Sequence, residues 1–343
     1  MTPTPRRYSS PSPWDDDPLG TLLETEAALA KAKAKLGRIP QAAADAIVRA
    51  TQQGYDYNEM RDFGEEHATI VVPLVERLRS HLSEEYHEYL HKPATSQDII
   101  DTALMLQASR NIGLTMPLLD RCIAAVRGLA SDFGETPQRA RTLLQPALPS
   151  TFGNLLASWQ SAIEDARARM ATVHEQSLAV QLGGPIGDLD DPELVRAFAA
   201  ELGLTAPERP WHTVRTRIVD LATALGLTTG ALAKIGVDVI MLSQPEIGEL
   251  EEGAAGSSSS MPDKRNPARS VQLAALAQRS PGLVATVFSA LPQELHRAAG
   301  RWQSEDAAVR ELLALTGKAA HHAVRLLEGL NVAADRMKAN LDG

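Results

Sequence analysis

The chain has 343 residues, of which 44% are hydrophobic, 22% are charged and 4% are aromatic, and its formal net charge is −9. This length allows a sizeable core and about two domains, whereas the negative charge argues against broad contact with a nucleic-acid backbone, which needs a basic surface. The single cysteine, Cys122, excludes an intramolecular disulfide, and no Cys or His spacing typical of a metal site occurs in the sequence.

The first 18 residues are rich in proline, serine and threonine and contain no apolar run, so we expect a mobile tail and not a signal peptide. No uninterrupted stretch of about 18 apolar residues, the length that spans a bilayer, occurs in the chain. We therefore expect a cytoplasmic protein that binds neither a membrane nor nucleic acid.

Apolar residues recur every three or four positions along most of the chain, which is the spacing of amphipathic helices. The predicted helices span 21–37, 42–53, a segment around 71–78, 96–133, 151–182, 192–203, 211–248, 281–299 and 306–330. Pro117 is expected to kink or interrupt the helix that contains it. Segments 134–149 and 183–191 resemble loops, and no alternating strand pattern is found.

Several of these helices exceed the ordinary length of about 12 residues, and long helices need partners along their whole length. The sequence therefore predicts an all-α bundle, with part of its apolar surface facing other subunits. We expect a tail at 1–18, a small N-terminal helical domain at 19–90 and a central helical-bundle domain at 91–343.

The segment 253–267 carries the densest set of chemically useful side chains. Its first part, GAAGSSSS, has the composition of a flexible linker when read alone. It is followed directly by MPDKRNP, which places Lys264 and Asn266 close to a run of serines. A linker has no need of these polar groups, so we favour a functional loop.

Such a loop suits the removal of a proton next to a carboxylate. That step forms a dianionic aci-carboxylate, which needs preorganised donors where the charge develops. Lys264 offers a cation, Asn266 an amide, and the serine run offers backbone N–H groups. A serine can be the base if nearby cations and N–H dipoles lower its pKa, and the small residues let the loop open and close.

The whole stretch GSSSSMPDKRNP resembles GSSxMPxKxNP, the signature of the fumarase/aspartase superfamily. Two further segments agree in order, since HKPATSQD at 91–98 resembles HxGATSQD, and RTLLQPALPSTFG at 141–153 resembles RTxxQxAxPxTFG. Four shorter likenesses, to 3-carboxy-cis,cis-muconate cycloisomerases, occur at 211–213, 244–248, 292–294 and 336–341. The resemblance runs from roughly residue 20 to the C-terminus, after which longer relatives add a small third helical domain.

This resemblance implies a fumarase/aspartase-like long-helix bundle that forms a homotetramer, with each active site built from segments of different subunits. It implies a small di- or tricarboxylate substrate, no cofactor and no metal. Ser259 matches the second serine of the signature and would be the base, while Lys264 and Asn266 would stabilise the aci-carboxylate. The extra serines leave the register open by one, so Ser258 and Ser260 are alternatives for the base. The residues expected to bind substrate are His91, Thr95, Ser96, Arg141, Gln145, Ser258, Ser260 and Met261.

Several of these residues also have a simpler explanation. Thr95 and Ser96 stand at a predicted helix start, where hydroxyls and free N–H groups suit an anion but also serve as an ordinary N-cap. Arg141 could equally form a surface ion pair, and an isolated histidine such as His91 is more often structural.

The sequence departs from the family at positions that line its active site. Leu143 and Pro146 stand where relatives carry a histidine, and neither side chain can carry a proton. Asp263 precedes the signature lysine, Pro93 replaces the glycine of HxGAT, and Asp188 in GGPIGD replaces a small hydroxyl. Residues 68–70 and 293–298 also differ from the family's GNP-like and QEHERA-like stretches.

Three explanations of these departures stay open. The leaving group needs no general acid, as for a carboxylate or nitrite, whose conjugate acids are strong. Alternatively, another residue is the acid, with His67, His212 and His296 as candidates. The third explanation is a catalytically degenerate, oligomeric binding protein.

We therefore predict a lyase or cycloisomerase that abstracts a proton next to a carboxylate with β-elimination or addition, most like 3-carboxy-cis,cis-muconate cycloisomerase. The nearest alternative is a C–N lyase of specialised metabolism, which would release fumarate from a nitro-, hydrazino- or amino-succinate. Amines would need protonation to leave, whereas nitrite would not.

Overall fold

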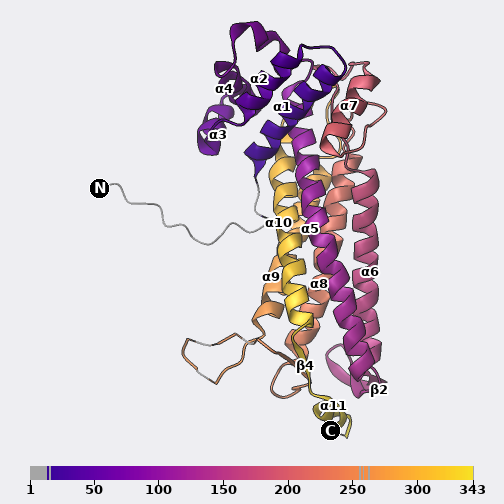
Figure 1. Cartoon of the computed structure of the whole chain (residues 1–343). Coiled ribbons are helices and arrows are strands. Elements are labelled where there is room, and N and C mark those ends of the chain that lie inside the picture. The colour runs from indigo at the N-terminus through magenta and orange to yellow at the C-terminus, as the bar shows by residue number, and fades with distance from the viewer. Residues whose placement is uncertain (1–13, 15–16, 255, 258, 262, 343) are drawn as a thin grey trace, which may run out of the picture.

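The long helices α5 (Ser96–Phe133), α6 (Phe152–Gln176), α8 (Thr216–Leu242), α9 (Ala268–Ser289) and α10 (Arg301–Leu327) lie side by side along the molecule (Figure 1). The structure is a computed structural model that describes residues 14, 17–254, 256–257, 259–261 and 263–342. Two clusters of buried apolar side chains follow each other along the bundle, one around Trp159 and Ile235 and one around Met105 and Leu225. The fold is therefore all-α, as the periodicity predicted.

A smaller group of helices covers one end of the bundle (Figure 1). It contains α1 (Pro18–Lys35), α2 (Gln41–Thr51), α3 (Tyr57–Glu65), α4 (Val71–Ser80) and the 3-10 helix η1 (Glu84–Tyr89). A third apolar cluster joins Leu22 of α1 to Phe198 of α7 (Pro192–Leu202) and to Ile99 at the start of α5. This cluster fixes the small helices on the end of α5 where the 91–98 segment lies, although the domain boundary expected at residue 90 stays a prediction.

The two prolines in the bundle do not end their helices. The helix expected at 96–133 has those bounds in α5 and is not interrupted at Pro117. The helix expected to begin at residue 281 begins instead at Ala268 and runs through Pro281. Proline cannot donate to the carbonyl four residues earlier, but the hydroxyl of Ser280 donates to that carbonyl, on Ala277, at 3.2 Å.

The expectation that the chain has no strands, and that 134–149 is a loop, was wrong. An antiparallel hairpin pairs β1 (Pro137–Thr142) with β2 (Gln145–Thr151), and a second short pair joins β3 (Leu250–Glu252) to β4 (Leu330–Val332). Proline-rich strands without a buried face show no apolar alternation, so the pattern could not reveal them. The short helices α3 and α11 (Ala334–Asp342) were also missed.

Among the described helices, α8 alone is long and apolar enough to cross a membrane, with a mean hydropathy of 1.6 over its most apolar window. Half of that window is buried in the bundle, where α8 packs along α6, α9 and α10. A core helix of a bundle has the same length and composition, so this property alone does not indicate a membrane protein.

Residues 1–13, 15 and 16 of the predicted tail lie outside the described residues. Trp14 lies within the same predicted tail and is 9% exposed. Its indole packs against the imidazole of His321 on α10, with 5.6 Å between ring centroids. At least this one side chain of the expected tail is therefore anchored on the bundle.

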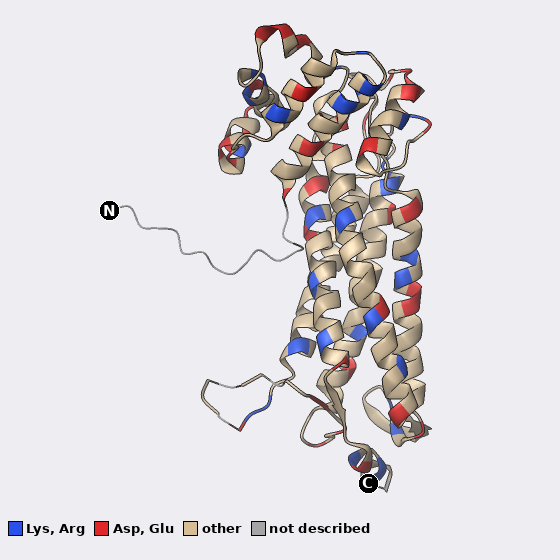
Figure 2. Ribbon diagram, in the orientation of Figure 1, with Lys and Arg blue, Asp and Glu red and all other residues tan. Residues whose placement is uncertain are grey.

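Charged residues are spread over the small helices and along the bundle, but stretches of the bundle ribbons between them carry none (Figure 2). Apolar side chains on these stretches are exposed, among them Leu227, Val237 and Phe288. This distribution leaves apolar faces along the bundle available to a partner.

Candidate active site

The first predicted site segment lies at the start of α5, next to the small helices (Figure 1). Thr95 is the N-cap with an extended backbone, and its N–H donates to Oδ2 of Asp98 at 3.0 Å. This reciprocal cap is what the pattern Thr-x-x-Asp favours. Thr95 and Ser96 are half-buried, and N–H groups in the first turn of a helix have no partner within the helix, so this end of α5 suits an anion.

Asp98 joins this helix start to two other segments. It accepts from the N–H groups of Gly183 and Gly184, both at 3.0 Å, and its Oδ1 lies 2.6 Å from Nε2 of His212. A Cβ on Gly183 would lie 2.7 Å from the His212 ring, so only glycine fits there. One buried carboxylate thus fixes the positions of the 95–98, 183–184 and 211–213 segments.

Arg297 covers the same end of α5. Its guanidinium donates to Oγ1 of Thr95 at 2.8 Å, to Oε1 of Gln97 at 2.6 Å and to the carbonyl of Pro185 at 3.3 Å. Burial lowers the pKa of Arg297, which the charges of Asp98 and Asp101 oppose, and an arginine remains cationic at neutral pH. The Thr95 hydroxyl is therefore in contact with a positive charge that could also bind a substrate carboxylate.

A buried ion network lies behind this surface. Arg215 donates to Asp101 at 2.7 and 2.9 Å and to Glu305 at 2.7 Å, and all three side chains are 1% exposed. Trp302 donates to Asp101 and Gln293 donates to Glu305. The network joins α5, α8 and α10, so it fixes the helices on which Thr95 and Arg297 depend.

His91 lies four residues before Thr95 in the same segment and is paired with a residue of α1. Its Nδ1 lies 2.6 Å from Oε1 of Glu26, which is 1% exposed. The predicted substrate-binding residues His91, Thr95 and Ser96 therefore share one end of the molecule.

The second predicted segment forms the β1–β2 hairpin at the other end of the bundle (Figure 1). Arg141 is held by two hydrogen bonds to Glu249, the shorter of 2.7 Å, and Glu249 also accepts from Gln138 and Asn340. This pairing gives Arg141 a structural role in the hairpin, so its expected contact with substrate stays a prediction. Gln145 is exposed on β2.

Leu143 and Leu144 form the turn of this hairpin, both with positive φ angles, of 51° and 62°. Leu143 is 96% exposed, and Leu148 on β2 is 79% exposed. Leu143, which replaces the histidine expected from the family pattern, thus projects into solvent close to other exposed leucines of the hairpin, and an apolar patch of this kind marks a candidate contact with another molecule.

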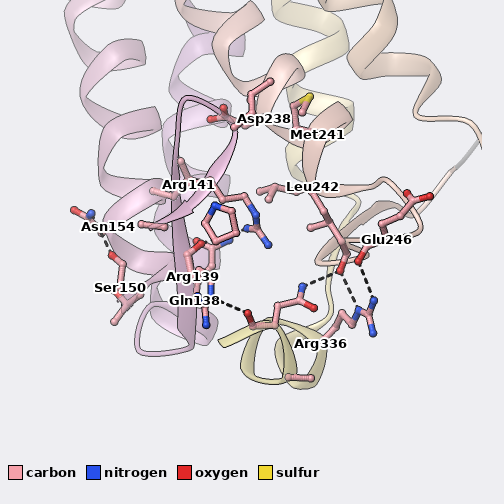
Figure 3. A pocket seen from close by; sticks show the side chains of 18 of the residues that line it. Gln138, Arg139, Arg141, Ser150, Asn154, Asp238, Met241, Leu242, Glu246 and Arg336 are labelled. Atoms are coloured by element: carbon pink, nitrogen blue, oxygen red, sulfur yellow. Dashed lines mark hydrogen bonds between the residues drawn. The ribbon is translucent and has the colours of Figure 1, made fainter. Parts of the chain in front are cut away.

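A cavity of about 840 Å³ lies between the hairpin, the end of α8 and α11 (Figure 3). Arg139, Arg141 and Arg336 lie along its wall, and Glu246 lies opposite the hairpin. Arg336 donates to the carbonyls of Glu246 and Ile247, both at 3.0 Å. Arg139 donates to the carbonyl of Asn340 at 2.9 Å, so the arginines of this wall hold α11 against the hairpin and against the segment that follows α8.

The signature segment leaves the bundle between β3 and α9, at the same end as the hairpin (Figure 1). Its base is closed by two hydrogen bonds of 2.9 Å between Gly256 and Asn266. Glu252 accepts from the N–H groups of Arg269 and Ser270, at 3.1 and 2.8 Å, and so caps α9. Ser259, Ser260, Met261 and Lys264 are exposed, and the alternative Ser258 lies outside the described residues.

The three predicted segments do not meet within one chain. The 38 residues of α5 separate the 91–98 segment from the hairpin, and at a rise of about 1.5 Å per residue this helix is roughly 57 Å long. The hairpin and the signature loop share one end, and the 91–98 segment occupies the other.

The three candidate replacement acids lie in different surroundings. His67 and His296 are exposed, and His296 directly precedes Arg297 in the chain. His212 is 4% exposed and is paired with Asp98. Of the three, His296 is both open to solvent and adjacent to the Thr95 end of the site.

Sequence reasoning did not assign a site role to Asp98 or Arg297. Both stand inside motifs that were recognised, ATSQD and the QEHERA-like stretch. The signal that could have found them is charge, since an aspartate and an arginine that interrupt apolar periodicity need partners. Among the described residues, no group of three or more His, Cys, Asp or Glu side chains could hold a metal ion.

A family model described as Lyase matches residues 14–282 of the chain. The chain belongs to the fumarase/aspartase superfamily. It is 41% identical to a nitrosuccinate lyase of Streptomyces davaonensis, over 94% of this chain and 72% of that protein. It is 40% identical to a 3-carboxy-cis,cis-muconate cycloisomerase of Pseudomonas aeruginosa, over 93% of this chain and 72% of that protein.

The structure superposes on the crystal structure of 3-carboxy-cis,cis-muconate lactonizing enzyme from Pseudomonas putida with a TM-score of 0.89 at 37% identity. This match covers 95% of this chain and 75% of that one. The predicted superfamily, the all-α fold and the lyase or cycloisomerase class are confirmed.

Proposed function

We propose that this member of the superfamily adds or eliminates a carboxylate next to an acidic C–H bond, as in the cycloisomerisation of 3-carboxymuconate to its lactone. Ser259 transfers the proton at the carbon beside a carboxylate, with Ser258 and Ser260 as alternatives. Lys264 and Asn266 stabilise the aci-carboxylate. Thr95, Ser96 and Gln145 bind substrate carboxylates, and His91, Arg141 and Met261 complete the site.

The observation that carries this proposal is the absence of a proton donor at the hairpin turn. Leu143 is 96% exposed at the tip, and Pro146 follows on β2. Neither can protonate a leaving group. A carboxylate leaves, or adds, without a proton because its conjugate acid is strong, whereas an amine or hydroxide needs protonation. A carboxylate leaving group therefore fits this chain.

Electrostatics at the Thr95 end support an anionic substrate. The helix start contributes N–H groups, and Arg297 contributes a cation 2.8 Å from the Thr95 hydroxyl. Lys264 on the exposed signature loop would supply the second cation where the aci-carboxylate develops. The two positive charges lie at opposite ends of the helical bundle of one chain.

This separation supports a homotetramer with composite active sites. The Thr95 end of one chain would meet the hairpin and the signature loop of other chains. In this arrangement the exposed Leu143 and Leu148 of each hairpin would be covered by a neighbouring chain. An apolar cavity of about 870 Å³ between α6, α8 and α9, lined by Leu227, Val284 and Phe288 among others, offers a face for such packing.

The second candidate is elimination of nitrite from nitrosuccinate. The same absence of a donor at Leu143 favours it, because nitrite also leaves without protonation. The likeness to a nitrosuccinate lyase at 41% identity makes this substrate a specific alternative.

The test is an ultraviolet assay of the purified protein with 3-carboxymuconate and, separately, with nitrosuccinate. Loss of muconate absorbance supports the first candidate, and formation of fumarate from nitrosuccinate supports the second. Tight binding of a dicarboxylate with turnover of neither substrate would contradict both and favour a catalytically degenerate binding protein.

The composite site is tested by mixing two inactive variants, Arg297→Met and Lys264→Met, after reversible dissociation. If Arg297 and Lys264 of one site come from different chains, about a quarter of the sites in a random mixture carry neither change. Activity should then return to roughly a quarter of the wild-type value. No recovery from well-assembled mixtures would contradict a composite site.

A further inference from the structure

The first helix of the chain holds the segment before α5 through two buried charged side chains. Glu26 and Lys33 are seven residues apart on α1, so they lie on the same face two turns apart. The carboxylate of Glu26 contacts Nδ1 of His91 at 2.6 Å. The ammonium of Lys33 donates to the carbonyls of Tyr89 and Lys92, at 2.7 and 2.5 Å.

A buried charge is costly unless it gains a partner that the fold needs. Glu26 is 1% exposed and Lys33 is 7% exposed. Lys33 contacts the backbone of this segment directly, through the carbonyls of Tyr89 and Lys92. Glu26 does not contact that backbone in any hydrogen bond between described residues, and its one such bond is to the imidazole. The contact of the Glu26 side chain is therefore with the imidazole ring of His91 and not with the backbone around it.

The ring of His91 is anchored at one nitrogen only. Nδ1 faces Glu26, and no hydrogen bond to Nε2 occurs among the residues that the structure describes. The side chain is 18% exposed, so the ring is not sealed in the core. His91 also has a positive φ of 67°, which directs the segment towards the Thr95 helix start four residues later.

We propose that Glu26 is a positioning residue, whose buried carboxylate holds His91 by Nδ1 in its cationic form and leaves Nε2–H to bind a carboxylate of the substrate. This inference rests on the proposed function for the presence of His91 in the substrate site. It makes the helical N-terminal segment a part of the binding machinery.

The charges around His91 favour the imidazolium. Burial on its own lowers the pKa of His91, but the hydrogen bond and negative charge of Glu26, with a smaller effect of Asp98, raise it above its ordinary value. Lys33 opposes this effect. The charged groups that face the ring are therefore Glu26 and Lys33 from α1 and Asp98 from α5, and the negative ones prevail.

The test compares Glu26→Gln with the wild-type full-length protein. Glutamine keeps the size and the acceptor but removes the charge. The pKa of His91 is measured by NMR titration without substrate, with its signal assigned by its loss in His91→Gln. We expect Glu26→Gln to lower the pKa of His91 and to weaken binding of propane-1,2,3-tricarboxylate at pH 7 by about tenfold, a typical effect of one charge-assisted hydrogen bond.

Glu24→Gln is the matched control. Glu24 lies on the same helix in an exposed pair with Arg110, so its loss should change neither the titration of His91 nor tricarboxylate binding. An unchanged His91 titration in Glu26→Gln would overturn the inference. This result is independent of turnover, so it can be told apart from failure of the proposed reaction.

A second measurement does not depend on the folding of a Glu26 variant. In the wild-type protein, binding of propane-1,2,3-tricarboxylate should weaken as the pH rises through the pKa of His91. His91→Gln should remove that dependence. A pH profile that is the same in both proteins would show that His91 is only a structural contact.

Discussion

Nε2 of His212 lies 2.6 Å from Oδ1 of Asp98, and the two side chains are 4% and 0% exposed. Asp98 also accepts from three backbone N–H groups, of Thr95, Gly183 and Gly184. A carboxylate has about four lone-pair sites that accept hydrogen bonds, so these four contacts occupy all of those on Asp98. The pair therefore organises the anion-binding end of α5, and His212 is already engaged in a buried contact.

Asp98→Asn should disrupt this arrangement, because an amide N–H₂ must then face at least one N–H group. Breaking a buried pair typically costs about 3–5 kcal/mol, so we expect a loss of unfolding free energy of that order and loss of substrate binding. Urea denaturation and calorimetry measure the two effects. Asp120→Asn is the control, since Asp120 and Arg167 form an exposed pair worth about 1 kcal/mol or less.

Arg297→Lys should impair substrate binding more than stability. A lysine keeps the charge but cannot donate to Thr95, Gln97 and Pro185 together in the fixed fork of a guanidinium. We expect kcat/KM to fall by about 10- to 100-fold, or about 1.4–2.8 kcal/mol, mainly through KM. Arg279→Lys, in an exposed pair with Glu311, should leave the kinetics unchanged. Wild-type kinetics in Arg297→Lys would remove Arg297 from the site.

Single alanine substitutions at Ser259 and Ser260 should identify the base. Loss of the base should reduce kcat by a factor of about 10³ or more while dicarboxylate binding persists, because the proton transfer has no other carrier. We expect this result for Ser259→Ala. If only Ser260→Ala shows it, the register is shifted by one, and if neither does, Ser258→Ala tests the remaining candidate for the base.

Glu305 should make stability depend on pH. Burial raises the pKa of Glu305 to about 7, against the effect of Arg215. Below its unfolded pKa of about 4.5 the group is protonated in both states, and between that value and about 7 only the folded state holds the proton. Its favourable contribution is therefore complete at low pH and is lost as the pH rises through 7.

Glu305→Gln should remove this decline. The unfolding free energy of the wild type should fall between pH 5 and pH 8, whereas that of the variant should not. The difference between the two proteins should therefore change over this range in favour of the variant, by on the order of a few kcal/mol at about 1.4 kcal/mol per pKa unit. Urea denaturation at several pH values measures the difference. Glu328→Gln, in an exposed pair with Arg121, should give a curve parallel to the wild type, and a parallel curve for Glu305→Gln would contradict the prediction.

The sequence by itself determined the superfamily, the helical class and the segments that carry chemistry. The helix at 96–133 was predicted with its observed bounds, because its Thr-x-x-Asp cap, its apolar period and Gly134 after its end are local signals. The signature serines, Lys264 and Asn266 were found for the same reason, since their chemistry is concentrated in one short stretch.

Only the tertiary structure decided which residues surround those segments. Thr95 and Arg297 are in contact although they are 202 residues apart in the sequence, and Asp98 and His212 are in contact at a separation of 114 residues. The hairpin that presents Leu143 escaped the pattern because its strands have no buried face. Contacts between distant charges depend on how the helices pack, and a local pattern of polarity does not encode which buried charge a given side chain will meet.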